Sequence, residues 1–484
     1  MLGVISMKPT SIIPTPTSLD ILTRTPPVNT LTLLQTATIY FQQHSRFLFI
    51  GLAPARFLPT VIRPVPIRRG TYTFNRQRRE MKIATLQFAP KLGDVEGNIR
   101  RANELLQHGK LLESRGTAAG MDALRPEILV LPELALTGEF NSFVFASSSS
   151  SFSSSGVLLT EHQPGYNFPS LEAIKPYLEP TGKGPSANWA RDVAKRYQCK
   201  VCVGYPELET ASTSSDGASD EQEKCYNSLL VVDESGEILA NYRKTFLYYT
   251  DETWAEEGDA ARSFQELSFA DPDHGATASS KVATSFGICM DINPYQFKAP
   301  FTAWEFANRV LDSKTQLVVL SMAWLTLLSR EELDVLADKP DLDTFNYWIQ
   351  RFIPLIRRKM KHNSDIDEAG AVDSDQDKRI ILVFANRTGE EEGAEGANLA
   401  RYAGTSAIIA IDQRAQPLSS SEKASTGAEN APNGSDKDGA KEETPPLDVK
   451  IHCWNLMGAA SEGICFADTQ EDPRMIFELV KRGG

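Results

Sequence analysis

Apolar stretches with the length of β-strands alternate with amphipathic, helix-like stretches from position 81 onward. Residues 81–90, MKIATLQFAP, predict a strand that ends at Pro90, and residues 98–112 place apolar side chains at helical spacing. Segments 227–233 and 237–243 flank the letters ESG and predict a hairpin. Strands interleaved with helices indicate an α/β fold. The other predicted strands are 127–133, 201–206, 282–288, 316–325, 379–386 and 405–412, the other predicted helices are 186–197 and 300–311, and a short ordered segment is expected at 449–454.

The first 80 residues differ in composition from the rest of the chain. Residues 1–79 contain ten Lys and Arg residues but a single acidic residue, Asp20, and they are rich in Ser, Thr and Pro. This acid-poor composition resembles an organelle transit segment. The alternatives are a disordered tail, or translation that truly starts at Met81. Because Pro64, Pro66 and the basic run at 76–79 oppose a folded core, we expect residues 1–80 to be an extension outside the domain.

Residues 81–484 are expected to form one domain with three insertions. Residues 146–156 include a serine run at 147–155, residues 330–378 form a second insertion, and residues 413–449 are rich in Ser, Gly, Ala, Glu and Lys. The first and third have the composition of flexible segments. No internal sequence repeat is visible. No run reaches the ~18 apolar residues that a transmembrane helix needs.

Charge and cysteine content bear on the partners, the compartment and the metal sites that this protein could have. The formal net charge of −13 argues against a general nucleic-acid or membrane partner and is compatible with a cationic substrate. Six cysteines in 484 residues indicate no dense disulfide framework and favour a reducing compartment. Cys199 and Cys202 form a C-x-x-C pair that would suit zinc or redox use. No second Cys or His pair lies nearby, however, and YQCKVCVGY predicts the start of a buried strand. We therefore expect no metal and no cofactor.

Three polar residues stand at the ends of apolar strands. Glu133 follows ILVLP, Lys244 follows ILANYR, and Cys289 follows VATSFGI. Taken singly, Glu133 could cap a helix, Lys244 could be solvated, and Cys289 could be a small buried hydrophobe. Together they would suffice for amide hydrolysis without a metal. A lysine cation favours the nucleophilic thiolate and an oxyanion, and a carboxylate can take up and return the proton.

The segments around these residues resemble the three signature segments of the nitrilase, or carbon–nitrogen hydrolase, superfamily. They are LVLPELALTGEF at 129–140, YRKTFLY at 242–248 and GICMDINPYQF at 287–297, in the order Glu, Lys, Cys. The resemblance covers residues 81 to 412. It implies a four-layer α-β-β-α sandwich with an internal pseudo-repeat of sheets, and a catalytic triad of Glu133, Lys244 and Cys289.

Segments outside the triad resemble one branch, the fungal protein N-terminal amidases. These segments are YRKTFLYYTDETW, CMDINPYQFKAPF, MAWL at 322–325, NYWIQRFIP at 346–354 and ANRTGEE at 385–391. One departure is Glu139, where the family usually carries an aromatic residue that shapes the pocket floor.

The resemblance implies hydrolysis of the side-chain amide of N-terminal Asn and Gln through a Cys289 thioester. Glu133 would be the base and then the acid, and Lys244 with the backbone N–H of Met290 would hold the oxyanion. Either Asp251 or Glu252 could be the second carboxylate of this superfamily, or both could belong to a solvated turn.

Asp291 is the candidate ligand for the α-ammonium group of the substrate, since a carboxylate near the nucleophile would pair with it. Its alternative role is to cap the following turn. The aromatic side chains that could line the pocket, or simply belong to the core, are Tyr295, Phe297, Trp324 and Trp348.

The branch implies a place in protein degradation. Its products, N-terminal Asp and Glu, are arginylated and then recognised for ubiquitin-mediated degradation along the N-end rule pathway. The alternatives are a small-molecule amidase, carbamoylase or nitrilase of the same superfamily, or a non-catalytic binding protein on this fold. We expect a cytoplasmic enzyme, with a mitochondrial form if translation starts at Met1.

Overall fold

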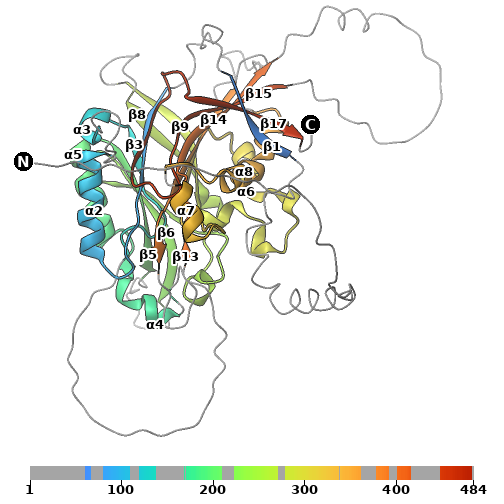
Figure 1. The fold of residues 1–484 in the computed structure, drawn as a ribbon. Coiled ribbons are helices and arrows are strands. Elements are labelled where there is room, and N and C mark those ends of the chain that lie inside the picture. The colour runs from blue at the N-terminus through green and yellow to red at the C-terminus, as the bar shows by residue number, and fades with distance from the viewer. Residues whose placement is uncertain are drawn as a thin grey trace, which may run out of the picture. The chain divides into compact units, whose positions relative to one another are not determined.

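In this computed structural model, two β-sheets lie at the centre of the described domain (Figure 1). Parallel and antiparallel strand pairs follow one another in the same order in both sheets. Met1–Ile50 and Gly51–Gly484 separate into two units, and every residue described here belongs to the second. Glu139, the serine run and residues 416–446 lie outside the described residues. The structure describes residues 60–66, 80–109, 119–137, 168, 170–209, 223–270, 278–336, 338–360, 378–391, 400–415 and 447–481.

The first sheet has the order β16-β2-β3-β5-β6-β7, and the short strand β4 pairs with β5. Strands β2, β3 and β5 run parallel, whereas β16, β6 and β7 pair antiparallel with their neighbours. The strands are β2 (Lys82–Gln87), β3 (Ile128–Val130), β4 (Glu179–Pro180), β5 (Lys200–Glu209), β6 (Lys224–Val232), β7 (Ile238–Arg243) and β16 (Gly463–Asp468).

The second sheet has the order β1-β17-β15-β14-β11-β10-β9-β8. Strands β9, β10 and β11 are parallel and the neighbours on both sides are antiparallel, so six strands repeat the topology of the first sheet. This is the pseudo-repeat that the resemblance implies. The strands are β1 (Thr60–Val65), β8 (Phe264–Ala270), β9 (Ser279–Ile288), β10 (Leu317–Met322), β11 (Lys378–Asn386), β14 (Ala407–Ala415), β15 (Leu447–Leu456) and β17 (Met475–Lys481), and β12 (Glu390–Glu391) pairs separately with β13 (Ala400–Arg401).

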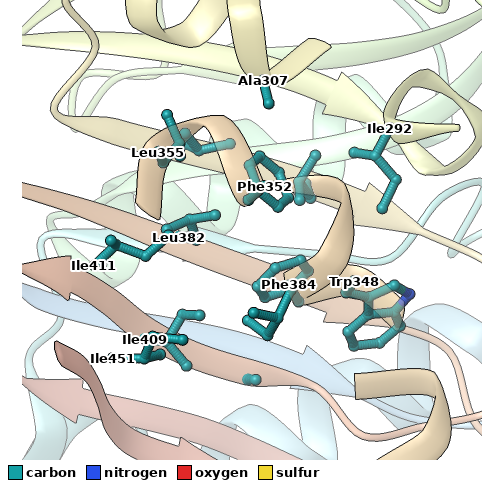
Figure 2. Close-up of a cluster of buried hydrophobic side chains, with 14 of the residues drawn as sticks. Ile292, Ala307, Trp348, Phe352, Leu355, Leu382, Phe384, Ile409, Ile411 and Ile451 are labelled. Atoms are coloured by element: carbon teal, nitrogen blue, oxygen red, sulfur yellow. The ribbon is translucent and has the colours of Figure 1, made fainter. Parts of the chain in front are cut away.

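Three apolar layers hold the sheets and helices together. Between the sheets lie buried side chains from both, including Val130, Leu229, Phe286 and Val319. Helices α2 and α5 cover the outer face of the first sheet, and α6, α8 and α9 cover the outer face of the second, where Figure 2 shows their packing. The predicted four-layer α-β-β-α sandwich is therefore confirmed. The helices are α2 (Val95–His108), α3 (Met121–Leu124), α4 (Leu171–Ile174), α5 (Pro185–Tyr197), α6 (Glu305–Asp312), α7 (Arg330–Leu336), α8 (Leu342–Arg351) and α9 (Ile353–Arg357).

One segment of the N-terminal extension is folded, contrary to the expectation that residues 1–80 lie outside the domain. Residues 60–65 form β1, which pairs along its length with β17 and packs against α8. Pro64 does not prevent this pairing, because β1 is an edge strand and a proline there removes no hydrogen bond needed by a second neighbour. Within the described ranges, no helix combines the length and apolarity of a membrane span.

The predicted insertion at 330–378 contributes to the core over its described part. It contains α7, α8 and α9, and Trp348 of α8 is fully buried against Phe384 of β11, with ring centroids 5.0 Å apart. Asp341 begins α8 by accepting a hydrogen bond from the backbone N–H of Thr344. This segment therefore belongs to the α-helical layer over the second sheet.

Candidate active site

Glu133 lies between the two sheets at the carboxyl end of β3. Its backbone N–H donates to the carbonyl oxygen of Met322 at the end of β10, 3.3 Å away, and its side chain is fully buried. A Cβ on Gly204 in the neighbouring strand would lie 2.8 Å from the backbone nitrogen of Leu134. The absence of a side chain at position 204 therefore lets the chain that carries Glu133 cross β5 closely.

Lys244 follows β7 and joins two carboxylates. Its Nζ donates to Oε1 of Glu133 at 2.6 Å and to Oδ2 of Asp251 at 2.5 Å. Asn227 of β6 completes a closed ring, because its Nδ2 donates to the same Glu133 oxygen at 2.8 Å and to Oδ1 of Asp251 at 3.0 Å. These four side chains are buried, whereas Glu252 is exposed. Of the two acidic residues left open by the sequence, Asp251 is thus the one beside Lys244.

Glu133 keeps one oxygen outside this ring. Its Oε2 accepts no hydrogen bond within the described part of the chain, although the atom is buried. A buried, unpaired carboxylate oxygen is costly unless it has a functional partner. Oε2 is therefore the oxygen of Glu133 that is available to exchange a proton.

Cys289 occupies a strained turn at the end of β9. It begins the 3₁₀ turn Cys289–Ile292 and has a φ of 38°, in the left-handed region that side-chain-bearing residues seldom adopt. The backbone N–H of Ala323, just after β10, is placed to donate to its sulfur. Such strain is frequent at active sites, where the surrounding structure holds a reactive group in place.

Asp291 fixes this turn rather than facing a substrate. Its Oδ2 accepts from the backbone N–H of Ile288 at 2.7 Å and from the Tyr242 hydroxyl at 2.8 Å. Its Oδ1 accepts from the backbone N–H groups of Thr245 and Phe246 at 3.0 and 2.8 Å and from the Thr245 hydroxyl at 2.8 Å. Five donors and complete burial leave no room for an α-ammonium group. The prediction that Asp291 binds the substrate amine is therefore not supported, and its turn-capping alternative describes the contacts.

Burial and neighbouring charge govern protonation at the site. Burial raises the pKa of Glu133 despite the opposing charge of Lys244, and the negative charge of Asp251 raises it further. Burial alone would lower the pKa of Lys244, but Asp251 and Glu133 keep it above its usual value.

Burial and the charge of Glu133 also raise the pKa of Cys289 well above that of a free thiol, against the effect of Lys244. Burial therefore favours the neutral thiol of Cys289, and the two carboxylates favour the charged form of Lys244. Lys244 acts in the direction expected from the sequence, because its charge lowers the pKa of Cys289, but burial has the larger effect, and the thiol is expected to lose its proton as it attacks.

Comparisons with known proteins show the family of this chain. The carbon-nitrogen hydrolase family matches residues 82–293. The protein N-terminal amidase of Schizosaccharomyces pombe is 32% identical over 347 residues, which cover 69% of this chain and 92% of that protein. The chain belongs to the protein N-terminal amidase family. As a member of the carbon–nitrogen hydrolases, it is an amidohydrolase that acts on C–N bonds other than peptide bonds.

Further similarities extend over much of the chain. The protein N-terminal amidase of Saccharomyces cerevisiae is 26% identical over 344 residues, which cover 58% of this chain and 65% of that protein. A crystal structure of N-terminal amidase with an Asn-Glu-Ala peptide aligns with a TM-score of 0.51 and 22% identity, covering 83% of this chain and 99% of that one. At this identity the structural match supports the fold of the N-terminal amidases.

The four aromatic candidates lie in two different environments. Trp324 and Trp348 are buried and pack against each other, with ring centroids 6.0 Å apart, so they belong to the core. Tyr295 and Phe297 lie in a partly exposed turn after the nucleophile, where Phe297 stacks on Tyr249 at 5.7 Å. Of the four, only Tyr295 and Phe297 lie near the surface.

Two groups at the site were not predicted from the sequence. Asn227 lies inside the apolar strand β6 and carries no motif, and the backbone N–H of Ala323 cannot be distinguished from any other by sequence. Cys199 and Cys202 were predicted to belong to a buried strand, and both are buried. Cys199 packs toward the helices and Cys202 toward the other sheet, so the two thiols do not face one site.

Proposed function

We propose that this enzyme hydrolyses the side-chain amide of N-terminal Asn and Gln in proteins and peptides, giving Asp and Glu with release of ammonia. The observation that carries the proposal is the buried ion pair of Lys244 with Glu133 and Asp251, at the strand ends that also hold Cys289. Membership of the N-terminal amidase family supports the choice of substrate. Similar solved structures of N-terminal amidase with Asn-Glu-Ala and Gln-Gly peptides also support it.

In the acylation step, Cys289 attacks the carboxamide carbon and Glu133 Oε2 accepts the thiol proton. The new S–C bond produces a tetrahedral oxyanion, which Lys244 Nζ and the backbone N–H of Met290 stabilise. Collapse of this intermediate breaks the C–N bond. Glu133 returns the proton to the leaving nitrogen, so ammonia departs and a thioester remains.

In the deacylation step, Glu133 takes a proton from water as the water attacks the thioester carbon. The C–S bond then breaks, the proton returns to the sulfur, and the acid product leaves. The raised pKa of Glu133 suits both steps, because a carboxylate with raised pKa is a stronger base and releases its proton at a pH nearer to neutrality.

The proposal also covers the fate of the products and the cellular location of the enzyme. N-terminal Asp and Glu would be substrates for arginyl transfer and then for ubiquitin-mediated degradation. We propose a cytoplasmic location, in keeping with six free cysteines among the described residues, and a mitochondrial form made from Met1. A fusion of residues 1–79 to a fluorescent reporter tests the second point, since signal confined to the cytosol would exclude it.

The substrate proposal is tested by mass spectrometry of a peptide series after incubation with the enzyme. The mass of peptides that begin with Asn or Gln should increase by the difference between a carboxamide and a carboxylic acid. Acetyl-Asn peptides, peptides with internal Asn, free glutamine and a simple nitrile should remain unchanged. Equal rates on free and acetylated Asn peptides would indicate a general amidase, and turnover of free glutamine or the nitrile alone would indicate a small-molecule enzyme. Turnover of none of these substrates would indicate a binding protein.

A further inference from the structure

A buried carboxylate close to the triad, Glu391, has no role in the chemistry described above. Glu391 lies on β12, after the end of β11, and its side chain is 3% exposed. Its Oε2 accepts a hydrogen bond from the Tyr402 hydroxyl and lies 3.8 Å from the Arg387 guanidinium. Its Oε1 accepts no hydrogen bond from any described residue. Because Oε1 is not among the fully buried unpaired oxygens of the described residues and Glu391 lines a cavity, this oxygen is open to a ligand from the cavity.

Glu391 faces a cavity that adjoins the triad. Asp251, which binds Lys244, and Leu134, which follows Glu133, line the same cavity, although Cys289 itself does not. Its other walls are largely apolar and are formed by Leu92, Thr137, Phe168, Thr250 and Trp254, with Arg387 beside Glu391. A carboxylate in apolar surroundings binds a cation more strongly than one in water does, because few water molecules compete.

Tyr402 links Glu391 to the nucleophile. It pairs with Leu325 through an isolated β-bridge, and the neighbouring Ala403 donates its N–H to the carbonyl oxygen of Trp324 at 2.9 Å. The backbone N–H of the preceding residue, Ala323, is placed to donate to the Cys289 sulfur. The charge of Glu133 contributes to the raised pKa of Tyr402, after burial and its nearer neighbours, which shows that Tyr402 also lies near the base.

The proposed substrate requires such a carboxylate within reach of Cys289. Two carbon atoms separate the carboxamide carbon of Asn from its α-nitrogen, and three separate them in Gln. The ammonium group of a bound substrate must therefore lie within about one side-chain length of the nucleophile.

The other buried carboxylates at the site are occupied. Asp291 has five donors, and Asp251 binds Lys244 and Asn227. Glu133 exchanges the proton in the proposed mechanism. Glu391 is the remaining carboxylate of this group with an unused oxygen.

We infer that Glu391 is the residue that binds the α-ammonium group of the substrate, with Oε1 as the acceptor and Tyr402 as the residue that orients the carboxylate. This inference rests on the proposed function and names the group that restricts the enzyme to chain ends. An acetylated or internal residue would leave Oε1 without its donor, and a buried polar group left unpaired can reject an analogue by ~10⁴-fold.

The test compares two peptides that differ only in the amine. One begins with Asn, and in the other the N-terminal residue lacks its α-amino group but keeps the carboxamide. We expect Glu391→Gln to lower kcat/KM for the Asn peptide by about 10²-fold and to change kcat/KM for the desamino peptide by less than threefold, because only the first loses a charge-assisted hydrogen bond. Full retention of the wild-type preference by Glu391→Gln would overturn the inference.

Glu390→Gln is the matched control. Glu390 precedes Glu391 on the same strand, but its oxygens pair with Arg330 at 2.8 Å and Arg401 at 2.7 Å. The substitution removes the same charge from the same segment and should leave both peptides within about twofold of wild type. A loss of preference equal to that of Glu391→Gln would show that overall charge, and not Glu391 contact, selects the amine, and would also overturn the inference.

Tyr402→Phe keeps the test decisive if Glu391→Gln does not fold. This change leaves the carboxylate but removes its donor, so the KM for the Asn peptide should rise several-fold while kcat/KM for the desamino peptide remains unchanged. An unchanged KM for the Asn peptide would contradict the inference. If wild-type enzyme itself does not distinguish the two peptides, the proposed function fails, which is a different outcome from failure of Glu391 alone.

Discussion

Around Lys244, each charged side chain is held by at least two partners, so the ring can keep its geometry through a catalytic cycle. Lys244 lies between Glu133 and Asp251, and Asn227 bonds to both carboxylates. Glu133, Lys244 and Cys289 could be predicted because they stand at strand ends inside signature segments. Asn227 and the choice of Asp251 over Glu252 could not, because only the three-dimensional arrangement decides which side chain reaches Lys244.

The partnership of Asp251 with Lys244 gives a residue-scale prediction. Asp251→Asn removes one of the two negative charges that hold the lysine cation, so kcat for an Asn peptide should fall by roughly 10- to 100-fold. The measurement is steady-state ammonia release. Glu252→Gln is the control, since Glu252 is the adjacent acidic residue but is exposed, and its kcat should stay within about twofold of wild type. A greater loss in Glu252→Gln than in Asp251→Asn would reverse the assignment.

The raised pKa of Glu133 gives a prediction for pH dependence. Glu133 must be ionised in the free enzyme to accept the proton of Cys289, so kcat/KM should rise with pH as this carboxyl loses its proton. Because burial raises its pKa, the acidic limb should lie above the ordinary glutamate value of about 4.3. The measurement is kcat/KM against pH with an Asn peptide. A limb at or below that value would contradict the account of a buried base.

At the scale of elements, the turn after β9 depends on a contact between distant segments. Asp291 bonds to the strand end before Cys289 and to the backbone just after Lys244, and it thereby fixes the distance between the two segments that carry these residues. The pattern of apolar residues located β9 and β7 but could not show this contact. An aspartate two residues after a nucleophile suits a ligand site as well as a cap, and only the positions of the backbone N–H groups distinguish them.

Asp291→Asn therefore tests a structural role. The amide would turn an N–H toward a backbone donor, leaving at least one buried group unpaired, so the free energy of unfolding should fall by about 2 kcal/mol or more. Because the Cys289 turn would also shift, kcat should fall for Asn and Gln peptides alike. Denaturant unfolding and steady-state kinetics measure the two effects. Unchanged stability combined with faster turnover of acetyl-Asn peptides would restore Asp291 as the amine ligand.

Some strands could be predicted from the pattern of apolar residues, and others could not. The hairpin of β6 and β7 was predicted from two strand-like segments that flank the ESG turn, and the buried strands β10 and β11 were predicted from their long apolar runs. Strands β8, β16 and β17 were not predicted. Exposed polar residues interrupt the apolar pattern of β8, whereas β16 and β17 are largely apolar, with buried and half-buried residues, and were overlooked. β1 was missed for a further reason, since its proline, Pro64, is tolerated at a sheet edge, and sequence does not reveal edge position.

At the scale of the whole sandwich, β1 connects the N-terminal part of the domain to the C-terminal strand β17. Thr60 exchanges hydrogen bonds with Gln350 of α8, at 2.8 and 3.1 Å, and the N–H of Ile62 donates to Asn346 at 3.1 Å. These contacts lie at the edge of the second sheet, while β9, which leads to Cys289, lies near the opposite edge. The strand therefore contributes to stability without contacting the active site.

A chain that begins at Met81 should accordingly be active but less stable than one that begins at Gly51. Loss of β1 exposes the edge of β17 and leaves Asn346 and Gln350 without their partners, so we expect the free energy of unfolding to fall by about 2–4 kcal/mol. At low temperature, kcat should match between the two proteins. Thermal unfolding and ammonia release measure these quantities. Equal stability would show that β1 is dispensable, and inactivity of the folded shorter chain would show that it reaches the active site.

The central claim, that this amidase works through a Cys289 thioester, is tested most directly by one comparison. Wild type, Cys289→Ala and Cys202→Ala are incubated with the same Asn-initiated peptide, and the product is measured by mass spectrometry. The account predicts Asp product from wild type and from Cys202→Ala, whose missing thiol is a buried core group, and no product above background from Cys289→Ala. Formation of Asp product by Cys289→Ala at the wild-type rate would contradict the account.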